Sequence, residues 1–171
     1  MLIASVAVIF FCQDYMKIKL LAVGTKMPSW VTEGFAEYTK RLSRDITVEL
    51  TEVALGTRSK NADTKKAIKQ ESDHLLAHIE PQDYVIALEV KGQSWNTEQL
   101  AEYIERWQMA GHTLVLLVGG PDGLSEQCRQ RANLQWSLSA LTLPHTIVRV
   151  LLAEQIYRAW SIIQKHPYHR S

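Results

Sequence analysis

The stretch that decides the fold lies at residues 114–123 and reads Leu114-Val115-Leu116-Leu117-Val118-Gly119-Gly120-Pro121-Asp122-Gly123. Five consecutive apolar residues are typical of a strand that is buried on both faces, as in a parallel sheet. The segment that follows them has the residues of a tight turn. It lacks the G-x-G-x-x-G spacing, and Pro121 removes a backbone donor that a phosphate cradle would use. The segment is therefore no dinucleotide-binding fingerprint.

Similar apolar runs alternate with amphipathic helical segments along the whole chain. We expect strands at residues 17–24, 46–54, 83–90, 113–119 and 134–139. We expect helices after Ser29 as N-cap, over 62–79, from Asn96 to Gly111, from Ser125 to about Asn133, and from His145 onward. This alternation predicts an α/β fold with a mostly parallel sheet flanked by helices.

Length and composition indicate one ordinary globular domain. The chain has 171 residues, of which 46% are hydrophobic and 22% charged, and it contains no internal repeat or low-complexity linker. Its formal net charge is +1, so the protein as a whole offers no strong field that would attract nucleic acid. An RNA contact would have to be a local patch.

Two segments carry a local excess of positive charge. The stretch 144–171 has one acidic residue, and its basic residues are Arg149, Arg158, Lys165 and Arg170. A second cluster consists of Arg58, Lys60, Lys65, Lys66 and Lys69. Each cluster has an alternative interpretation as a solvated helix face.

Cys12 and Cys128 are far apart, and neither belongs to a CxxC pair. This spacing favours neither a disulfide framework nor a zinc site, and it fits a reducing cytoplasm. Residues 1–12 are apolar, but no Lys or Arg precedes them and they are too short to span a bilayer. Because Met16 directly precedes the first expected strand, we interpret residues 1–15 as a non-native or disordered extension of a single domain at 16–171.

The segment Leu138-Ser139-Ala140-Leu141-Thr142-Leu143-Pro144-His145 connects a strand to a helix but is mostly apolar. Connections normally lie on the surface and are polar, so this one requires a cover, which is either a ligand or a second subunit. The chain then ends in His166-Pro167-Tyr168-His169-Arg170. A metal site at the two histidines is disfavoured, because Pro167 interrupts any helix there and no acidic or sulfur ligand is near in sequence.

These features in this order resemble the SPOUT class of methyltransferases, and within it the ribosomal large-subunit pseudouridine methyltransferase H family. The resemblance runs from Met16 to Arg170. It is carried by residues 21–28 (LAVGTKMP), 60–63 (KNAD), 119–125 (GGPDGLS), 136–145 (WSLSALTLPH), 157–161 (YRAWS) and 166–170 (HPYHR).

The resemblance implies a homodimeric enzyme that uses S-adenosylmethionine to methylate N3 of a pseudouridine in large-subunit (23S) ribosomal RNA of the assembled ribosome. It also implies a C-terminal trefoil knot, no metal and no membrane association. The cofactor-binding residues implied are Leu88, Gly120, Ser139, Ala140, Leu141, Thr142, Leu143 and Pro144. Leu and Pro side chains suit the flat faces of adenine, and Gly120 lets the backbone approach without a Cβ.

Methyl transfer from a sulfonium needs mainly alignment of the reacting atoms, together with removal of the proton on N3. The tail supplies the expected catalytic residues, with His169 as base, Tyr168 as a partner of the nucleobase and Arg170 as a phosphate or carbonyl contact. His145 and Glu154 are second choices. Two alternatives stay open at this point, namely a non-catalytic ribosome-binding module of the same fold and a generic nucleotide-binding α/β protein.

Overall fold

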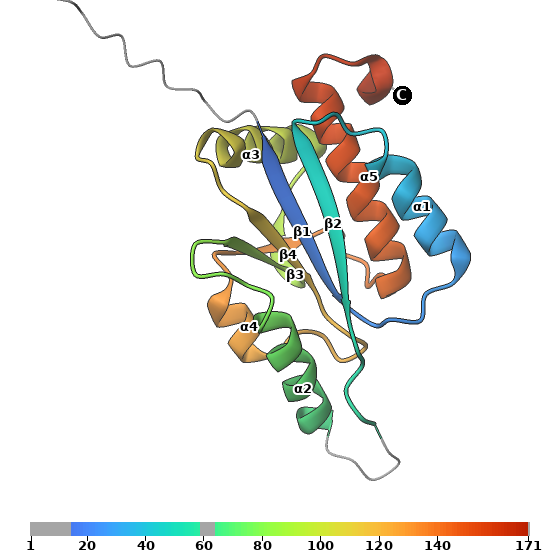
Figure 1. Cartoon of the computed structure of the whole chain (residues 1–171), viewed down its shortest axis with the longest axis vertical. Helices are drawn as coiled ribbons and strands as arrows, with labels where there is room; N and C mark the ends of the chain where they lie inside the picture. The colour runs from blue at the N-terminus through green and yellow to red at the C-terminus, as the bar shows by residue number, and fades with distance from the viewer. Residues whose placement is uncertain (1–14, 59–63, 171) are drawn as a thin grey trace, which may run out of the picture.

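The computed structural model describes residues 15–58 and 64–170. Its strands are β1 (Met16–Val23), β2 (Ile46–Val53), β3 (Tyr84–Ser94), β4 (Leu114–Val118) and β5 (Leu134–Ser137). They form one sheet in the order β2-β1-β4-β3-β5, and every neighbouring pair is parallel (Figure 1). The predicted α/β fold with a parallel sheet is therefore confirmed. The predictions for residues 1–14 and for Lys60 lie outside the described residues.

Within the described residues, five α-helices and one short 3-10 helix surround the sheet. They are α1 (Ser29–Thr39), α2 (Thr64–Leu76), α3 (Thr97–Met109), α4 (Glu126–Arg131), α5 (His145–Ile163) and η1 (Pro167–Arg170). Two of the expected caps are present: the Asn96 side chain accepts from Gln99 N (2.8 Å), and Ser125 Oγ accepts from Cys128 N (3.2 Å). The expected cap at Ser29 is wrong. Pro28 occupies the N-cap position, and its carbonyl accepts from Val31 N (3.0 Å).

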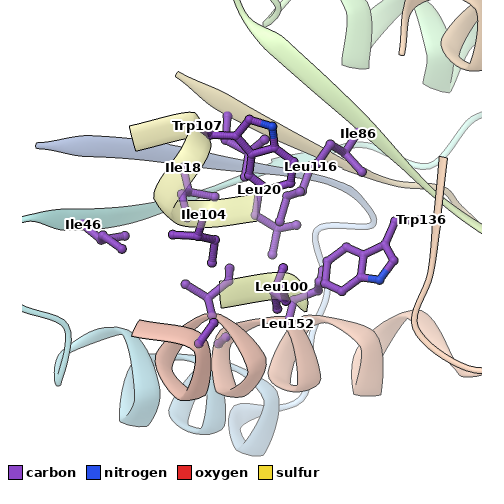
Figure 2. Close-up of a cluster of buried hydrophobic side chains, with 14 of the residues drawn as sticks. Ile18, Leu20, Ile46, Ile86, Leu100, Ile104, Trp107, Leu116, Trp136 and Leu152 are labelled. Carbon is purple, nitrogen blue, oxygen red and sulfur yellow. The ribbon is translucent and has the colours of Figure 1, made fainter. Parts of the chain in front are cut away.

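The two faces of the sheet bury different helices, because side chains alternate along each strand. Ile18 and Leu20 of β1 belong to a core that includes residues of α1, α3 and α5, and Figure 2 shows these strand residues above Leu152 of α5. Leu21 belongs to the opposite core, which includes Leu75 of α2. β4 lies at the centre of the sheet and all five of its residues are buried, as its sequence predicts.

β3 extends four residues beyond its expected end at residue 90 because its ladder with β5 contains a bulge. Both Leu88 and Gln93 pair with Trp136, so the intervening residues 89–92 form an extra length of strand. A Cβ on Gly92 would lie 2.7 Å from backbone atoms of Gln135 and Trp136, so only glycine allows the strands to approach this closely.

The chain reverses direction after α5. His166 N donates to Ser161 O (2.8 Å) and Lys165 N donates to Ile162 O (3.0 Å), which is the bonding pattern of a Schellman cap. Lys165 takes the left-handed conformation that this cap requires, with φ of 55°. The reversal folds η1 back against the last turns of α5.

Candidate functional site

A cavity of about 440 Å³ lies at the carboxyl ends of β3, β4 and β5, next to the N-terminus of α5. Carboxyl ends of parallel strands gather at one edge of a sheet, which is where open α/β sheets bind ligands. The residues that line the cavity are mainly apolar: Leu88, Glu89, Val90, Val118, Gly119, Gly120, Pro121, Gly123, Trp136, Ser137, Leu138, Ser139, Leu141, Thr142, Leu143, Pro144, His145 and Val148. We call this cavity the apolar pocket.

All the residues predicted to bind a cofactor line the apolar pocket except Ala140, which is exposed on the loop between β5 and α5. Two side chains shape this loop. Ser137 Oγ donates to Ser139 O (2.9 Å), and Ser139 Oγ accepts from Leu141 N (3.0 Å). The loop is open on its outer side, since Leu141 is 72% exposed. The expected need for a cover therefore remains in the structure of the single chain.

The segment after β4 forms the tight turn that its sequence predicts, in which Gly123 N donates to Gly120 O (3.0 Å). Behind Gly120 lies Glu71 of α2, which is 2% exposed. A Cβ on Gly120 would lie 2.9 Å from Glu71 Oε2 and 3.1 Å from Val23 Cγ1. Glycine at position 120 therefore lets the turn pack against a buried carboxylate.

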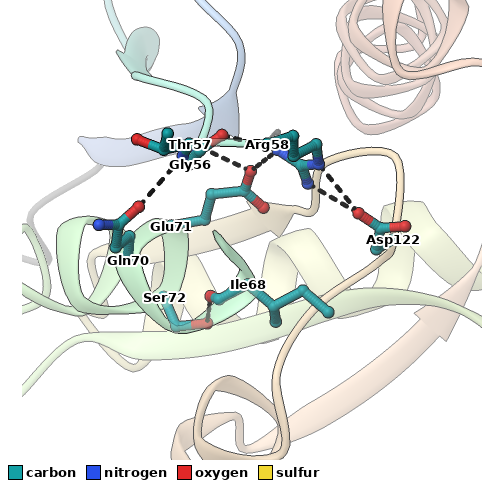
Figure 3. Close-up of polar contacts among 8 residues, drawn as sticks. All are labelled: Gly56, Thr57, Arg58, Ile68, Gln70, Glu71, Ser72 and Asp122. Carbon is teal, nitrogen blue, oxygen red and sulfur yellow. Dashed lines mark hydrogen bonds and ion pairs between the residues drawn. The ribbon is translucent and has the colours of Figure 1, made fainter. Parts of the chain in front are cut away.

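Glu71 is held by a polar network that also reaches this turn (Figure 3). Glu71 Oε1 accepts from Gly56 N (2.9 Å) and from Arg58 Nη1 (2.6 Å). Arg58 Nη2 pairs with Asp122 at 2.8 Å. The hydrogen bond to Glu71, and next the one to Asp122, raise the pKa of Arg58. This network connects α2 and residues 56–58 to Asp122, which lies between the pocket-lining residues Pro121 and Gly123.

His145 begins α5 and faces the pocket, as the sequence places it. Burial, and next the charge of Arg149, lower the pKa of His145 from 6.5, so its imidazole is neutral at pH 7. Arg149 is fully buried one turn further along α5. Its Nη2 donates to Gly24 O (2.7 Å) and Val23 O (3.0 Å), which fixes the start of α5 against the end of β1.

The predicted catalytic tail lies at the other end of α5, where η1 folds onto the helix. Tyr168 Oη donates to Glu154 Oε1 (3.1 Å), and the Tyr168 ring packs against Tyr157 with centroids 4.7 Å apart. Burial, and next Glu154, raise the pKa of Tyr168 to about 12, so its phenol is protonated at neutral pH. Arg158 Cζ lies 4.8 Å from the centre of the same ring.

Glu154 and Arg158 form the i,i+4 ion pair that their spacing predicts, with Arg158 Nη2 at 2.6 Å from Glu154 Oε1. This hydrogen bond raises the pKa of Arg158. His169 follows Tyr168 in η1, and its Nδ1 is buried without a hydrogen-bond partner in the described part of the chain. Arg170 closes η1, and its side chain lies outside the described part. We call Glu154, Arg158, Tyr168 and His169 the tail cluster.

The structure does not bring the tail cluster and the apolar pocket together within one chain. The pocket includes His145 at the N-terminus of α5, whereas η1 follows the C-terminus of this 19-residue helix (Figure 1) and folds back along it, so that Tyr168 reaches Glu154. Glu154 comes nine positions after His145 in α5, which is about 14 Å along the helix axis at about 1.5 Å per residue. Of the residues proposed for proton transfer, His145 alone lines the pocket.

Metal-ligand clusters and membrane-spanning helices are both absent from residues 15–58 and 64–170. No group of three or more His, Cys, Asp or Glu side chains there is placed to hold a metal ion. In the same ranges no helix is both long and apolar enough to cross a membrane.

A parallel sheet flanked by helices, with an apolar pocket at the carboxyl ends of β3, β4 and β5, defines an open α/β protein whose pocket lies where such sheets bind ligands. The family model described as predicted SPOUT methyltransferase matches residues 16–169, and the chain belongs to this family.

Curated relatives cover the same region. The chain is 59% identical over 155 residues to the ribosomal RNA large subunit methyltransferase H of Hahella chejuensis, covering 91% of this chain and 99% of the relative. It is 56% identical to the protein of that name from Marinomonas sp., covering 91% and 100%. A probable methylase family protein from Haemophilus influenzae has a similar fold, with TM-score 0.52, 11% identity, and coverage of 92% of this chain and 70% of that one.

Sequence reasoning missed several residues of both regions. Glu89 and Trp136 line the pocket, and Arg158 joins the tail cluster, whereas the sequence indicates that it adds positive charge to residues 144–171. Glu89 follows Leu88 directly, so the expected end of the strand was a signal that pointed to it. No local pattern indicates that η1 folds back onto Arg158, because that contact depends on the cap at Lys165.

Proposed function

We propose that this protein is an S-adenosylmethionine-dependent methyltransferase that methylates N3 of a pseudouridine in large-subunit ribosomal RNA, on the assembled ribosome in the cytoplasm. The apolar pocket is the observation that carries this proposal, because nearly all the residues expected to bind the cofactor line one cavity of suitable size. The names of the relatives support an RNA of the large subunit as the substrate.

The residues of the pocket fit the proposed cofactor. Leu88, Leu143 and Pro144 supply apolar surface for the adenine, and the loop from Ser139 supplies backbone donors and acceptors for its edge. Gly120 presents backbone without a side chain, because Glu71 fills the space behind it. When bound, the cofactor supplies a methyl group that is already activated for transfer.

The side chains at the two ends of α5 suit different parts of the reaction. His145 is neutral at pH 7, so it can accept a hydrogen bond or a proton at the pocket. Tyr168 is a protonated phenol and serves as a hydrogen-bond donor or stacking surface rather than as a base. His169 Nδ1 has no partner among the described residues and is our candidate for the proton acceptor of the tail. Arg170 is the proposed contact to phosphate or carbonyl oxygen.

We propose that the active site is completed by a second copy of the chain, because no residue of the tail cluster lines the pocket of its own chain. Exposed apolar residues beside the pocket support a homodimer. Trp30 is 50% and Ile147 45% exposed. Gly34 packs on Val150 and Tyr38 on Tyr157, so α1 and α5 run in the same direction and Trp30 and Ile147 lie at the pocket end.

The function is tested by incubating the purified protein and labelled S-adenosylmethionine with ribosomes from a strain that lacks it. We expect one methyl group on a pseudouridine of the large-subunit RNA, located by mass mapping. Binding of ribosomes without binding of S-adenosylmethionine in calorimetry would instead favour a non-catalytic ribosome-binding module. Tighter binding of a nucleoside phosphate than of the methyl donor would favour the generic nucleotide-binding alternative.

The composite site is tested by mixing two inactive variants, one with Gly120→Val in the pocket and one that lacks residues 168–171. If a pocket from one subunit works with the tail of the other, a 1:1 mixture of exchanging dimers recovers about a quarter of wild-type activity, since half the dimers have one intact site. A mixture that stays inactive although heterodimers form would reject the composite site. A protein that elutes from a sizing column as a monomer and is fully active would also reject the composite site.

A further inference from the structure

Glu89 places a carboxylate in the wall of the apolar pocket, where its side chain is 19% exposed. Its position follows from the bulge in β3, since Leu88 and Gln93 both pair with Trp136 and residues 89–92 bow out of the ladder. Bulges of this kind often re-aim a side chain next to an active site. Among the described residues that line the pocket, Glu89 is the acidic one.

The charges around Glu89 leave this wall negative. Arg129 Nε donates to Glu89 Oε1 at 2.9 Å, but Arg129 Nη1 also lies 3.6 Å from Glu126 Oε2. Two carboxylates therefore share one guanidinium. The other titratable residue of the lining is His145, which is neutral at pH 7, and the nearby Arg149 is paired with Glu52. The cluster of Glu89, Arg129 and Glu126 thus has a net charge of about −1.

We propose that Glu89 is a specificity-determining residue that makes the pocket prefer the positively charged methyl donor over its neutral product. This inference rests on the proposed function. S-adenosylmethionine and S-adenosylhomocysteine share their adenine, ribose, ammonium and carboxylate groups, and they differ by a methyl group and the positive charge on sulfur. A carboxylate in a partly buried, apolar wall attracts that charge more strongly than it would in water. The same wall therefore holds the product less tightly.

Calorimetric dissociation constants for both compounds test this directly, measured at pH 7.5 on the wild type, Glu89→Gln, Arg129→Gln and Glu102→Gln. Glu89→Gln lowers the preference for S-adenosylmethionine over S-adenosylhomocysteine by about tenfold, equivalent to about 1.4 kcal/mol. Arg129→Gln raises the preference, because it removes the cation that offsets Glu89. Glu102→Gln, which removes an exposed carboxylate paired with Arg106 on α3, leaves the preference unchanged.

Two outcomes would overturn the inference. If Glu89→Gln weakens the binding of both compounds by the same factor, Glu89 contacts a group that the two compounds share. If Arg129→Gln lowers the preference as Glu89→Gln does, the ion pair acts by positioning the wall and not by charge. Unchanged thermal unfolding of each variant shows that the pocket is folded. A wild-type protein that binds neither compound would reject the proposed function itself, which is a different result.

Discussion

Replacing Arg149 tests how the fold holds the apolar pocket together. Its side chain is 0% exposed, and its Nη2 donates to the carbonyl oxygens of Val23 (3.0 Å) and Gly24 (2.7 Å), while Nη1 pairs with Glu52. These contacts join the first turns of α5 to the carboxyl ends of β1 and β2. We predict that Arg149→Met, which keeps a similar apolar length, lowers the free energy of unfolding.

The magnitude follows from the groups that the substitution leaves behind. Two carbonyl oxygens lose a charged donor, and a buried group left unsatisfied costs about 1–3 kcal/mol. Breaking a buried ion pair costs about 3–5 kcal/mol, but Glu52 is 31% exposed and can be rehydrated. Arg149 Nε has no partner in the described part of the chain, so its burial is already unfavourable. We therefore expect a loss of about 3 kcal/mol, near the lower end of this range, and a fall in Tm of about 6–12 °C.

Urea unfolding followed by circular dichroism measures this loss, with Glu49→Gln on the same strand as the control. The control removes a carboxylate from an exposed ion pair with Lys17 and keeps every contact of Arg149, so it costs no more than about 1 kcal/mol. Buried ion pairs can sometimes be replaced by apolar side chains without loss. A cost for Arg149→Met that is no greater than that of the control would show that this is the case here, and would refute the assigned role of the carbonyl bonds.

Three further predictions concern positions along the same pocket and helix. Because the pKa of His145 is lowered in the folded state, its contribution to stability is complete above pH 6.5 and is lost as the pH falls below that value. In urea titrations, the free energy of unfolding will therefore fall less between pH 7.5 and pH 5.5 for His145→Asn than for the wild type. Lys165→Gly relieves a left-handed conformation with φ of 55° and raises the free energy of unfolding by about 1 kcal/mol, and a decrease would contradict this. Gly120→Ala places a Cβ 2.9 Å from Glu71 Oε2, so it costs about 1–3 kcal/mol in stability and weakens cofactor binding in calorimetry, whereas unchanged binding would show that the turn can move freely.

The sheet could be predicted from sequence because its signals are local. The run from Leu114 to Val118 is apolar without interruption, and the structure places it at the centre of the sheet with every residue buried. The caps at Asn96 and Ser125 depend on a side chain and a backbone amide three residues apart, so the sequence contains them completely. Ser29 failed as a cap because Pro28, whose backbone angles already suit the position before a helix, takes that place.

The pocket was partly predictable for a geometrical reason. Leu88 lies in β3, Gly120 comes after β4 and Ser139 comes after β5, and these strands are parallel, so the three positions meet at one edge of the sheet once the strands are assigned. Glu89 was not predicted, because the bulge in β3 depends on how closely β5 approaches Gly92. Glu71 belongs to a polar helix and carries no sequence signal of its burial, which arises from its contacts to Gly56 and Arg58.

The sequence does not indicate that the tail and the pocket of one chain are separated in space. His145 and Tyr168 are only 23 positions apart, yet α5 between them is one continuous helix of 19 residues. Tyr168 reaches back along this helix only to Glu154, which comes nine positions after His145, or about 14 Å along the helix axis. The Tyr168 phenol is already bonded to Glu154 and packed on Tyr157 in the single chain. A mobile tail would have to break these contacts to reach the pocket of its own chain, and this is why the proposed second subunit is the simpler explanation.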